Sequence, residues 1–368
     1  MTGKIKWTKT LLGAILGIGT VTVISCGGGG GGSSSGSSNT SPAYEGTYSG
    51  AASAGDLATF TVNGTKLTYH VWGSVFGNIT GTLTLVPWAA GNGFFWKNDT
   101  EGVYLAVFKN VGVAGIDTEN GTATVVGLHE PSNVTDFDFN RTFIFTMVYK
   151  ENNGTQEVWY QDSGLLKFNA TDKTASLTYL TDNTTVSYNY TVNSTTNTID
   201  LLNGTDVVAH IIYKQADTGS EFLVIDLAGG KGFGIARDTT PLQPDETKTY
   251  KVYYYGEDPN ENDTWWGNGT VYYDSGLGKW ISIWQDNGEY NGTPYTEKGA
   301  SVIHFNTVCV YNATTGEYDL IPFNGTACGC AYNVTTDQEN RTDCANGIID
   351  FSNQMYITLG GYFEIGGW

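Results

Sequence analysis

The chain has 368 residues, of which 37 are acidic and 18 are basic, so its net charge is −19 at pH 7. This acidity argues against nucleic acid as a partner, because phosphates repel an acidic surface, and its ordinary role is solubility. The 327 residues that follow position 41 exceed what one hydrophobic core usually serves, which predicts two or three domains.

Residues 1–26 have the features of an export signal. Three lysines precede an apolar segment from Leu11 to Ile24, which is too short to span a bilayer because roughly 20 residues are needed. The segment Val23-Ile24-Ser25-Cys26 resembles the lipobox of prokaryotic lipoproteins. The resemblance implies a signal peptide over 1–25, a lipid on Cys26 and a protein anchored outside the cytoplasm, at the membrane or cell surface. Ordinary secretion with cleavage elsewhere is the alternative.

Residues 26–41 form the predicted linker. Glycine and serine make up nearly all of the segment from Gly27 to Ser41, so it buries little apolar surface and behaves as a flexible coil that reaches about 20 Å. Such a coil is suited to holding a folded body away from an anchor. Removal of the signal leaves 15 basic against 37 acidic residues, a net charge of −22.

The rest of the chain predicts an all-β fold. Short runs rich in β-branched and aromatic residues recur about every ten residues, without room for crossover helices. They cover 57–62, 66–71, 81–86, 103–108, 142–149, 176–180, 186–192, 208–213, 222–227, 250–255, 279–284, 301–305 and 355–359. Tandem antiparallel meanders of this kind close into small barrels or fold into sandwiches, which hides their edges.

An internal repeat predicts three units, over 42–130, 138–240 and 246–368. VWYQDSGLLKF (158–168) and TVYYDSGLGKW (270–280) share a strand, an Asp-Ser-Gly turn and a closing aromatic. Segments 103–117, 222–238 and 355–367 each combine a strand, a turn and a glycine-rich final strand. The up-and-down order resembles that of calycin barrels, which bind small ligands inside, although the signature near their first strand is missing.

Asparagine is followed by threonine unusually often. Of 29 asparagines, 20 begin an Asn-x-Ser/Thr triplet, and all but Asn39 have threonine at the third position. The triplet is the acceptor of N-linked glycans, so we expect a dense sugar coat. Seven triplets read Asn-Gly-Thr, which type I′ hairpin turns also explain. The predicted acceptors are Asn63, Asn78, Asn98, Asn120, Asn133, Asn140, Asn153, Asn169, Asn183, Asn189, Asn193, Asn203, Asn262, Asn268, Asn291, Asn312, Asn324, Asn333 and Asn340.

Four cysteines follow Cys26, all in the last unit: Cys309, Cys328, Cys330 and Cys344. An even number in an exported domain predicts two disulfides, with bound metal as the other interpretation. We expect Cys328 and Cys330 to point to opposite faces of an extended chain and to bond different partners. Cys309 and Cys344 are then those partners, in an order that the sequence leaves open.

No catalytic constellation is evident. His70, His129, His210 and His304 are scattered, without metal-ligand spacing, and tight turns explain both Asp-Ser-Gly segments. DPNENDT (258–264) offers oxygen ligands but lacks the glycine and distal glutamate of a helix-loop-helix calcium loop. We therefore predict no catalytic residue, no cofactor and no metal.

Tryptophans in the third unit are the clearest candidates for binding. Trp265, Trp266, Trp280 and Trp284 lie within twenty residues, and exposed indoles stack on sugar rings or form protein interfaces. Packing in the core is the alternative. The sequence thus predicts a lipid-anchored, N-glycosylated surface protein with a structural, adhesive or ligand-capturing role. The alternative is an extracellular carbohydrate-binding or carbohydrate-active protein, and the expected partners are the membrane, a glycan or another surface protein.

Overall fold

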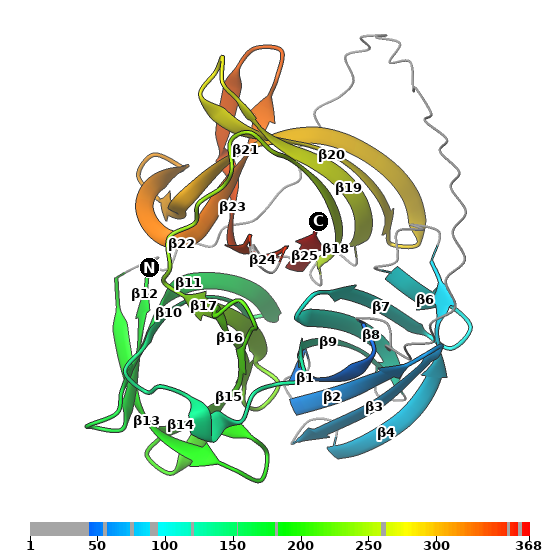
Figure 1. The fold of residues 1–368 in the computed structure, drawn as a ribbon, viewed down its shortest axis with the longest axis vertical. Helices are drawn as coiled ribbons and strands as arrows, with labels where there is room; N and C mark the ends of the chain where they lie inside the picture. The colour runs from blue at the N-terminus through cyan, green and yellow to red at the C-terminus, as the bar shows by residue number, and fades with distance from the viewer. Residues whose placement is uncertain are drawn as a thin grey trace, which may run out of the picture. The chain divides into compact units, whose positions relative to one another are not determined.

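The computed structural model describes a protein built almost wholly of strands (Figure 1). The described residues are 44–53, 57–73, 77–88, 95–118, 121–152, 154–180, 183–258, 263–351, 354–359 and 363–368. Cys26, the predicted signal peptide and the linker lie outside them. The one helix among the described elements is the short 3₁₀ helix η1 (Val134–Asp136), so the all-β prediction is confirmed. No helix in the described part of the chain has the length and hydrophobicity that a membrane crossing requires.

The first unit is an open antiparallel sheet of nine strands, in the order β4-β3-β2-β1-β9-β8-β7-β6-β5. Its first strand pairs with both the second and the last, as in a barrel, but β4 and β5 end the sheet. The strands are β1 (Gly46–Ala52), β2 (Leu57–Asn63), β3 (Lys66–Gly73), β4 (Gly77–Thr84), β5 (Val86–Pro87), β6 (Phe95–Asn98), β7 (Val103–Phe108), β8 (Val111–Thr118) and β9 (Gly121–His129).

The second unit is a closed eight-stranded barrel in which β10 pairs with both β11 and β17. Aliphatic and phenylalanine side chains fill it, and Phe143, Phe145 and Met147 are at most 2% exposed. The strands are β10 (Thr142–Asn152), β11 (Glu157–Asn169), β12 (Thr174–Tyr179), β13 (Thr185–Asn193), β14 (Thr198–Asn203), β15 (Asp206–Gln215), β16 (Glu221–Leu227) and β17 (Gly232–Asp238).

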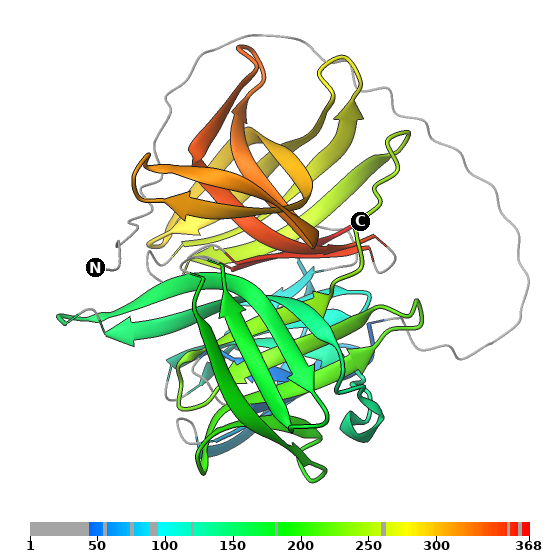
Figure 2. The ribbon, with the colours of Figure 1, turned by 90° about the vertical axis from the view of Figure 1, so that its left-hand side faces the viewer.

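The third unit is a second closed barrel, in which β18 pairs with both β19 and β25. Its longest strands, β21 and β22, are drawn in yellow and orange in Figures 1 and 2. The strands are β18 (Thr249–Asp258), β19 (Asp263–Asp274), β20 (Lys279–Tyr290), β21 (Thr293–Asn312), β22 (Glu317–Asn333), β23 (Gln338–Asp350), β24 (Met355–Leu359) and β25 (Phe363–Gly367). Barrels, rather than sandwiches, are therefore the way the second and third meanders hide their edges.

Alternation of side chains accounts for the core. In β2, Ala58, Phe60 and Val62 are buried while the threonines between them are half-exposed, as a strand with one covered face requires. Residues on the outer faces of all three units also pack in one shared hydrophobic cluster. Ala43–Trp368 is accordingly one compact body. Arg237 of β17 adds a buried ion pair to Asp350 of β23, with 3.2 Å between Nε and Oδ2.

The two Asp-Ser-Gly segments do not form equivalent turns, which corrects the sequence interpretation. Residues 162–164 lie inside the continuous strand β11, whereas residues 274–276 begin the hairpin turn between β19 and β20. There, the Oδ1 of Asp274 accepts hydrogen bonds from the backbone N–H groups of Gly276 and Leu277. The difference arises because residues 162–164 all pair with β10, and β12 joins the ladder at residue 164, so cross-strand pairing overrides the local turn preference.

The Asn-Gly-Thr segments also differ from one another. Asn291 and Gly292 are the two loop residues of the β20–β21 hairpin and both have positive φ, as type I′ turns require. At Asn63 and Asn203 the asparagine is instead the last strand residue, and the following glycine, with positive φ, takes the first loop position. That arrangement is the one of type II′ turns, so the expectation of positive φ at both residues is wrong at these two sites.

Candidate functional site

The inner face of the third barrel differs chemically from that of the second. One cluster gathers Val252, Tyr254 and Trp265, with Trp284 and other aromatic residues packed against it. By contrast, Tyr253 and Tyr255 of the same strand, β18, pack in the cluster shared with the other units. Alternation therefore places Tyr254 and its neighbours inside the barrel and Tyr255 outside.

Trp265 illustrates how this inner face is built. The Cα register aligns Trp265 of β19, Gly256 of β18 and Glu364 of β25 across three neighbouring strands. The indole lies over the glycine, where a Cβ atom would sit 2.3 Å from its Cε2 atom. Beyond the glycine, Nε1 donates a hydrogen bond of 2.9 Å to Oε2 of Glu364. Glycine is thus required because it lets the ring pass over the middle strand.

Tyr254 repeats this arrangement in the opposite direction around the barrel. Tyr254 of β18, Gly267 of β19 and Asp286 of β20 are in register. The ring covers Gly267, and its hydroxyl donates a hydrogen bond to Oδ1 of Asp286. Both triples therefore consist of an aromatic ring, a glycine and a carboxylate on adjacent strands.

Further aromatic residues of the barrel also lie over a glycine on the next strand. Tyr356 covers Gly366 and donates to Oε1 of Glu364 at 2.8 Å. Trp284 covers Gly299. Tyr295 covers Gly288 in the same way and donates a 2.9 Å hydrogen bond to Asp263. These contacts give the inner face flat aromatic surfaces that are bordered by acceptor oxygens.

Burial and nearby negative charges keep the tyrosine hydroxyls on this face protonated, so that they act as hydrogen-bond donors. Burial raises the pKa of Tyr254 above its usual range, and the negative charges of Asp286 and Glu364 raise it further. Burial also raises the pKa of Glu364, although hydrogen bonds from Trp265 and Tyr356 oppose the increase. The tyrosines thus keep their protons, and the carboxylates supply the acceptors.

The inner face is also reached by solvent. Trp284, Asp286, Tyr295 and Glu364 are half-buried, so solvent reaches part of this face.

A cleft of about 390 Å³ lies in the same barrel, a volume within the range of small-molecule sites. Its aromatic lining includes Tyr273, Trp280 and Phe305, and its polar lining includes His304 and Glu246. The rings of Trp280 and Phe305 meet edge to face, 5.3 Å apart between centroids. The cleft therefore combines ring surfaces with ionisable groups.

The four predicted stacking tryptophans do not form one exposed platform. Trp265 and Trp280 are 6% and 8% exposed, and Trp266 and Trp284 are half-buried. Trp265 and Trp284 lie on the inner face, and Trp280 lines the cleft. Trp266 faces outward and packs 4.8 Å from Trp88 of the first unit.

The predicted glycan acceptors lie at the surface wherever the structure describes them. Asn120, Asn153 and Asn262 lie outside the described residues. Of the other sixteen, none is buried. Asn98, Asn169, Asn193 and Asn312 are half-buried; the exposed ones are Asn63, Asn78, Asn133, Asn140, Asn183, Asn189, Asn203, Asn268, Asn291, Asn324, Asn333 and Asn340.

The half-buried acceptors share one turn geometry. At Asn169, Oδ1 accepts the backbone N–H of Thr171 while Nδ2 donates to Asp172. At Asn193 and Asn312, Oδ1 accepts the backbone N–H of the threonine two residues on, and Nδ2 donates to a carboxylate. Threonine at the third position therefore has a turn role as well as an acceptor role.

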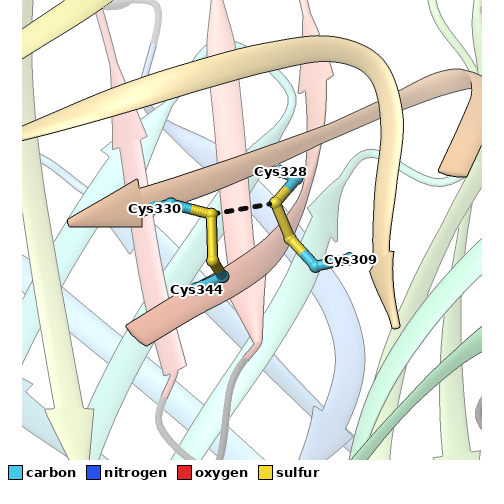
Figure 3. Close-up of side chains that lie close together, drawn as sticks. All are labelled: Cys309, Cys328, Cys330 and Cys344. Carbon is cyan, nitrogen blue, oxygen red and sulfur yellow. Dashed lines mark hydrogen bonds between the residues drawn. A yellow bond between two sulfur atoms is a disulfide. The ribbon is translucent and has the colours of Figure 1, made fainter. Parts of the chain in front are cut away.

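Two disulfides connect the four cysteines, Cys309 to Cys328 and Cys330 to Cys344 (Figure 3). Cys328 and Cys330 bond different partners, but the expected reason was wrong. Residues two apart on a strand point to the same face, and their sulfur atoms lie 3.6 Å apart. The bridges join β21 to β22 and β22 to β23.

The histidines have separate partners. Nδ1 of His210 lies 2.7 Å from Oδ1 of Asp200, and Nε2 of His304 lies 3.1 Å from Oε1 of Glu339. Nε2 of His70 lies 2.6 Å from Oδ1 of Asn78, and Nε2 of His129 lies 2.9 Å from the backbone oxygen of Glu45. Most of the acidic segment 258–264 lies outside the described residues.

Sequence reasoning missed Asp286, Glu364 and Tyr254 as members of one site. A signal was present, because Gly267 and Gly269 follow Trp265 at every second position of β19 and so share its face. Glycine inside a strand marks a place where another group approaches closely. Which aromatic ring covers a given glycine depends on how the two strands are aligned, and the sequence of one strand does not specify that alignment.

No protein-family model matches the chain, and no curated protein matches it. Among solved structures, kievitone hydratase from Nectria haematococca is similar at 9% identity and a TM-score of 0.20, over 64% of this chain and 94% of that one. Isotype 1 transferrin binding protein B from serogroup B Neisseria meningitidis has 10% identity and a TM-score of 0.21, over 85% and 65%. Intact Ap-TbpB, with its N and C lobes, has 10% identity and a TM-score of 0.19, over 85% and 66%. At such TM-scores these likenesses carry no argument about what this chain does.

Proposed function

We propose that this chain is a lipid-anchored, N-glycosylated protein of the cell surface whose third barrel captures a small carbohydrate ligand. The observation that carries the ligand-binding part is the inner face of that barrel, where aromatic rings lie flat over glycines beside Asp286 and Glu364. The second barrel is filled mainly by apolar side chains, and the ring that covers a glycine there, Phe145 over Gly164, carries no hydrogen-bonding group.

The chemistry of this face suits a sugar. Pyranose rings present C–H surfaces that pack on indole and phenol rings, and their hydroxyl hydrogens find acceptors in carboxylate oxygens. The half-buried side chains Trp284, Asp286 and Glu364 leave this combination within reach of solvent. An amino sugar adds a positive charge, which the carboxylates favour over an acetylated one.

The surface location rests on three features. The lipobox-like segment ends at Cys26, the described triplet asparagines are exposed or half-buried, and the last unit carries disulfides, which persist in oxidising compartments. Together they support a tethered, sugar-coated protein that presents a binding barrel outside the cytoplasm.

Titration of tryptophan fluorescence tests ligand capture. The probes are glucosamine oligomers and their N-acetylated counterparts of equal length. We expect a saturable change with the amino form, and Trp284→Leu should weaken it by at least about tenfold, or 1.4 kcal/mol. Asp286→Asn keeps an acceptor for Tyr254 but removes one of the two negative charges, so it should weaken the preference for the amino form.

Trp266→Leu is the matched control, because Trp266 is also half-buried but faces outward. It should leave the titration unchanged. An equal loss of affinity in Trp266→Leu and Trp284→Leu, or no saturable change in fluorescence with either oligomer, would contradict sugar capture by the barrel.

The alternative, a carbohydrate-active enzyme, is distinguished in the same samples. Both carboxylate oxygens of Glu364 accept hydrogen bonds from ring groups, which favours a positioning role in binding over proton transfer. Shortening of the oligomers by the wild-type chain, and not by Glu364→Gln, would establish catalysis and contradict the binding proposal.

A further inference from the structure

The four cysteines of the third barrel form a compact sulfur cluster at its outer face. We propose that the reduced form of this cluster binds one tetrahedral, thiophilic metal ion of the Zn²⁺ class through Cys309, Cys328, Cys330 and Cys344. All four Sγ atoms lie within 4.8 Å of one another. Figure 3 shows the two bridges side by side.

The spacing of the sulfur atoms suits such an ion. At a Zn–S distance of about 2.3 Å, the edge of a regular S₄ tetrahedron is about 3.8 Å. The sulfur atoms of Cys328 and Cys330 already lie 3.6 Å apart. A regular set requires the bridged sulfur atoms to separate and the widest pair, now within 4.8 Å, to approach, and rotation of the reduced side chains about χ1 moves the sulfur atoms in this way.

The backbone holds the cysteines in place without the disulfides. Cys328 and Cys330 lie within the β22 ladder, and Cys330 is directly opposite Cys344 of β23. The side chain of Asn346 holds the backbone of the fourth cysteine, Cys309. Its Oδ1 accepts the backbone N–H of Cys309 at 2.7 Å, and its Nδ2 donates to the backbone oxygen of Cys309 at 2.9 Å. The donor atoms thus stay together when the bridges are broken.

Burial favours the ion over water. The four cysteines are at most 3% exposed, and closed Cys₄ sets without a water ligand are typical of structural zinc sites. A metal in this position would join β21, β22 and β23 as the disulfides do. The barrel would therefore keep a cross-link in both oxidation states.

The chemistry balances with a phosphine as the reductant. Two disulfides, two phosphines and two waters give four thiols and two phosphine oxides. Four thiols and one Zn²⁺ then give the tetrathiolate complex and release four protons, because the thiolate is the ligand.

Titration of the reduced full chain with Co²⁺ under nitrogen tests the proposal. A Cys26→Ser background leaves only the four thiols of the third barrel. We expect one Co²⁺ per chain, with the intense visible bands and sulfur-to-metal charge transfer of a tetrahedral tetrathiolate, and displacement by Zn²⁺. The oxidised chain should show neither.

Cys344→Ser removes one ligand and should weaken binding by at least about tenfold. Circular dichroism of the reduced chain, with and without metal, monitors the fold. Unchanged binding in Cys344→Ser, a spectrum of octahedral Co²⁺, or a reduced chain that unfolds and does not refold with Co²⁺ or Zn²⁺ would each overturn the proposal.

Discussion

At the scale of single residues, the contact between Gly256 and Trp265 determines whether the inner face of the third barrel forms. A Cβ at Gly256 would lie 2.3 Å from the indole, so Gly256→Ala should displace the ring and break its hydrogen bond to Glu364. Overpacking of this kind costs roughly 1 to 3 kcal/mol. Chemical denaturation followed by tryptophan fluorescence measures the loss.

Gly329→Ala is the matched control for this change. Gly329 lies in β22 of the same barrel, and nothing lies within 4 Å of its added Cβ. Its substitution should be neutral or slightly stabilising, because glycine weakens a strand by roughly 0.5 to 1 kcal/mol. Equal losses for both alanine variants would refute the role assigned to the ring contact.

His210 gives the fold a dependence on pH. Burial lowers its pKa, but the hydrogen bond that His210 donates to Asp200 and the charges of Asp200 and Asp226 outweigh burial and raise the pKa. These two residues are in register with His210 on either side. A raised histidine pKa stabilises the fold below the unfolded pKa of about 6.5, and this contribution is lost as pH rises through the folded value.

Asp200 sets the lower end of the pH range in which its pairing with His210 stabilises the fold. Burial raises its pKa, but hydrogen bonds with His210 and Thr198 lower it overall, so its contribution is lost as pH falls below about 4. His210→Gln should therefore destabilise the chain by about 1 kcal/mol near pH 5.5 and by less near pH 8.5. Urea unfolding at the two pH values checks this, and a larger loss at pH 8.5 would be the contrary result.

At the scale of elements, one asparagine joins a bulge to the segment between the barrels. The β21–β22 ladder shifts register between Phe305 and Thr307, and Asn306 between them has a φ of 52°. Its side chain accepts from and donates to the backbone of Leu242, at 2.7 and 2.8 Å, and accepts from Gly325. The bulge thus fixes where the chain enters the third barrel.

Both Asn306→Gly and Asn306→Ala remove the hydrogen bonds of the side chain, but glycine tolerates the positive φ whereas alanine is strained by it. We expect losses of about 1 to 3 kcal/mol for glycine and about 1 kcal/mol more for alanine. Thermal unfolding of both variants measures the difference. An alanine variant as stable as the glycine variant would show that the backbone conformation contributes nothing.

Strands and their antiparallel order could be predicted from the sequence because they depend on local alternation and spacing. Closure could not be predicted, because it depends on whether first and last strands pair: β10 and β17 do, while β4 and β5 end an open sheet. The Asp-Ser-Gly segment at 162–164 was misread for the same reason, since cross-strand pairing decided its conformation. The carboxylates of the site could not be predicted from the sequence, because the aromatic residues that bond them lie two strands away.

At the scale of the whole molecule, the chain is expected to carry two kinds of modification. Mass spectrometry of protein purified from its own cells should find acyl chains on Cys26 and glycopeptides at exposed triplets such as Asn63, Asn133 and Asn333. Occupancy should be lower at Asn169 and Asn193, whose amides are bonded to carboxylates. Unmodified peptides across these sites, or an unacylated Cys26, would contradict the surface proposal.

The ring-over-glycine contact also constrains how this protein can diverge. If the indole at position 265 shrinks, the space above residue 256 opens and a larger side chain fits there; if residue 256 enlarges first, the indole has no room. Descendants of this sequence should therefore exchange the two positions together, in the order ring first and glycine second. The same historical rule applies to Tyr254 with Gly267 and to Tyr356 with Gly366.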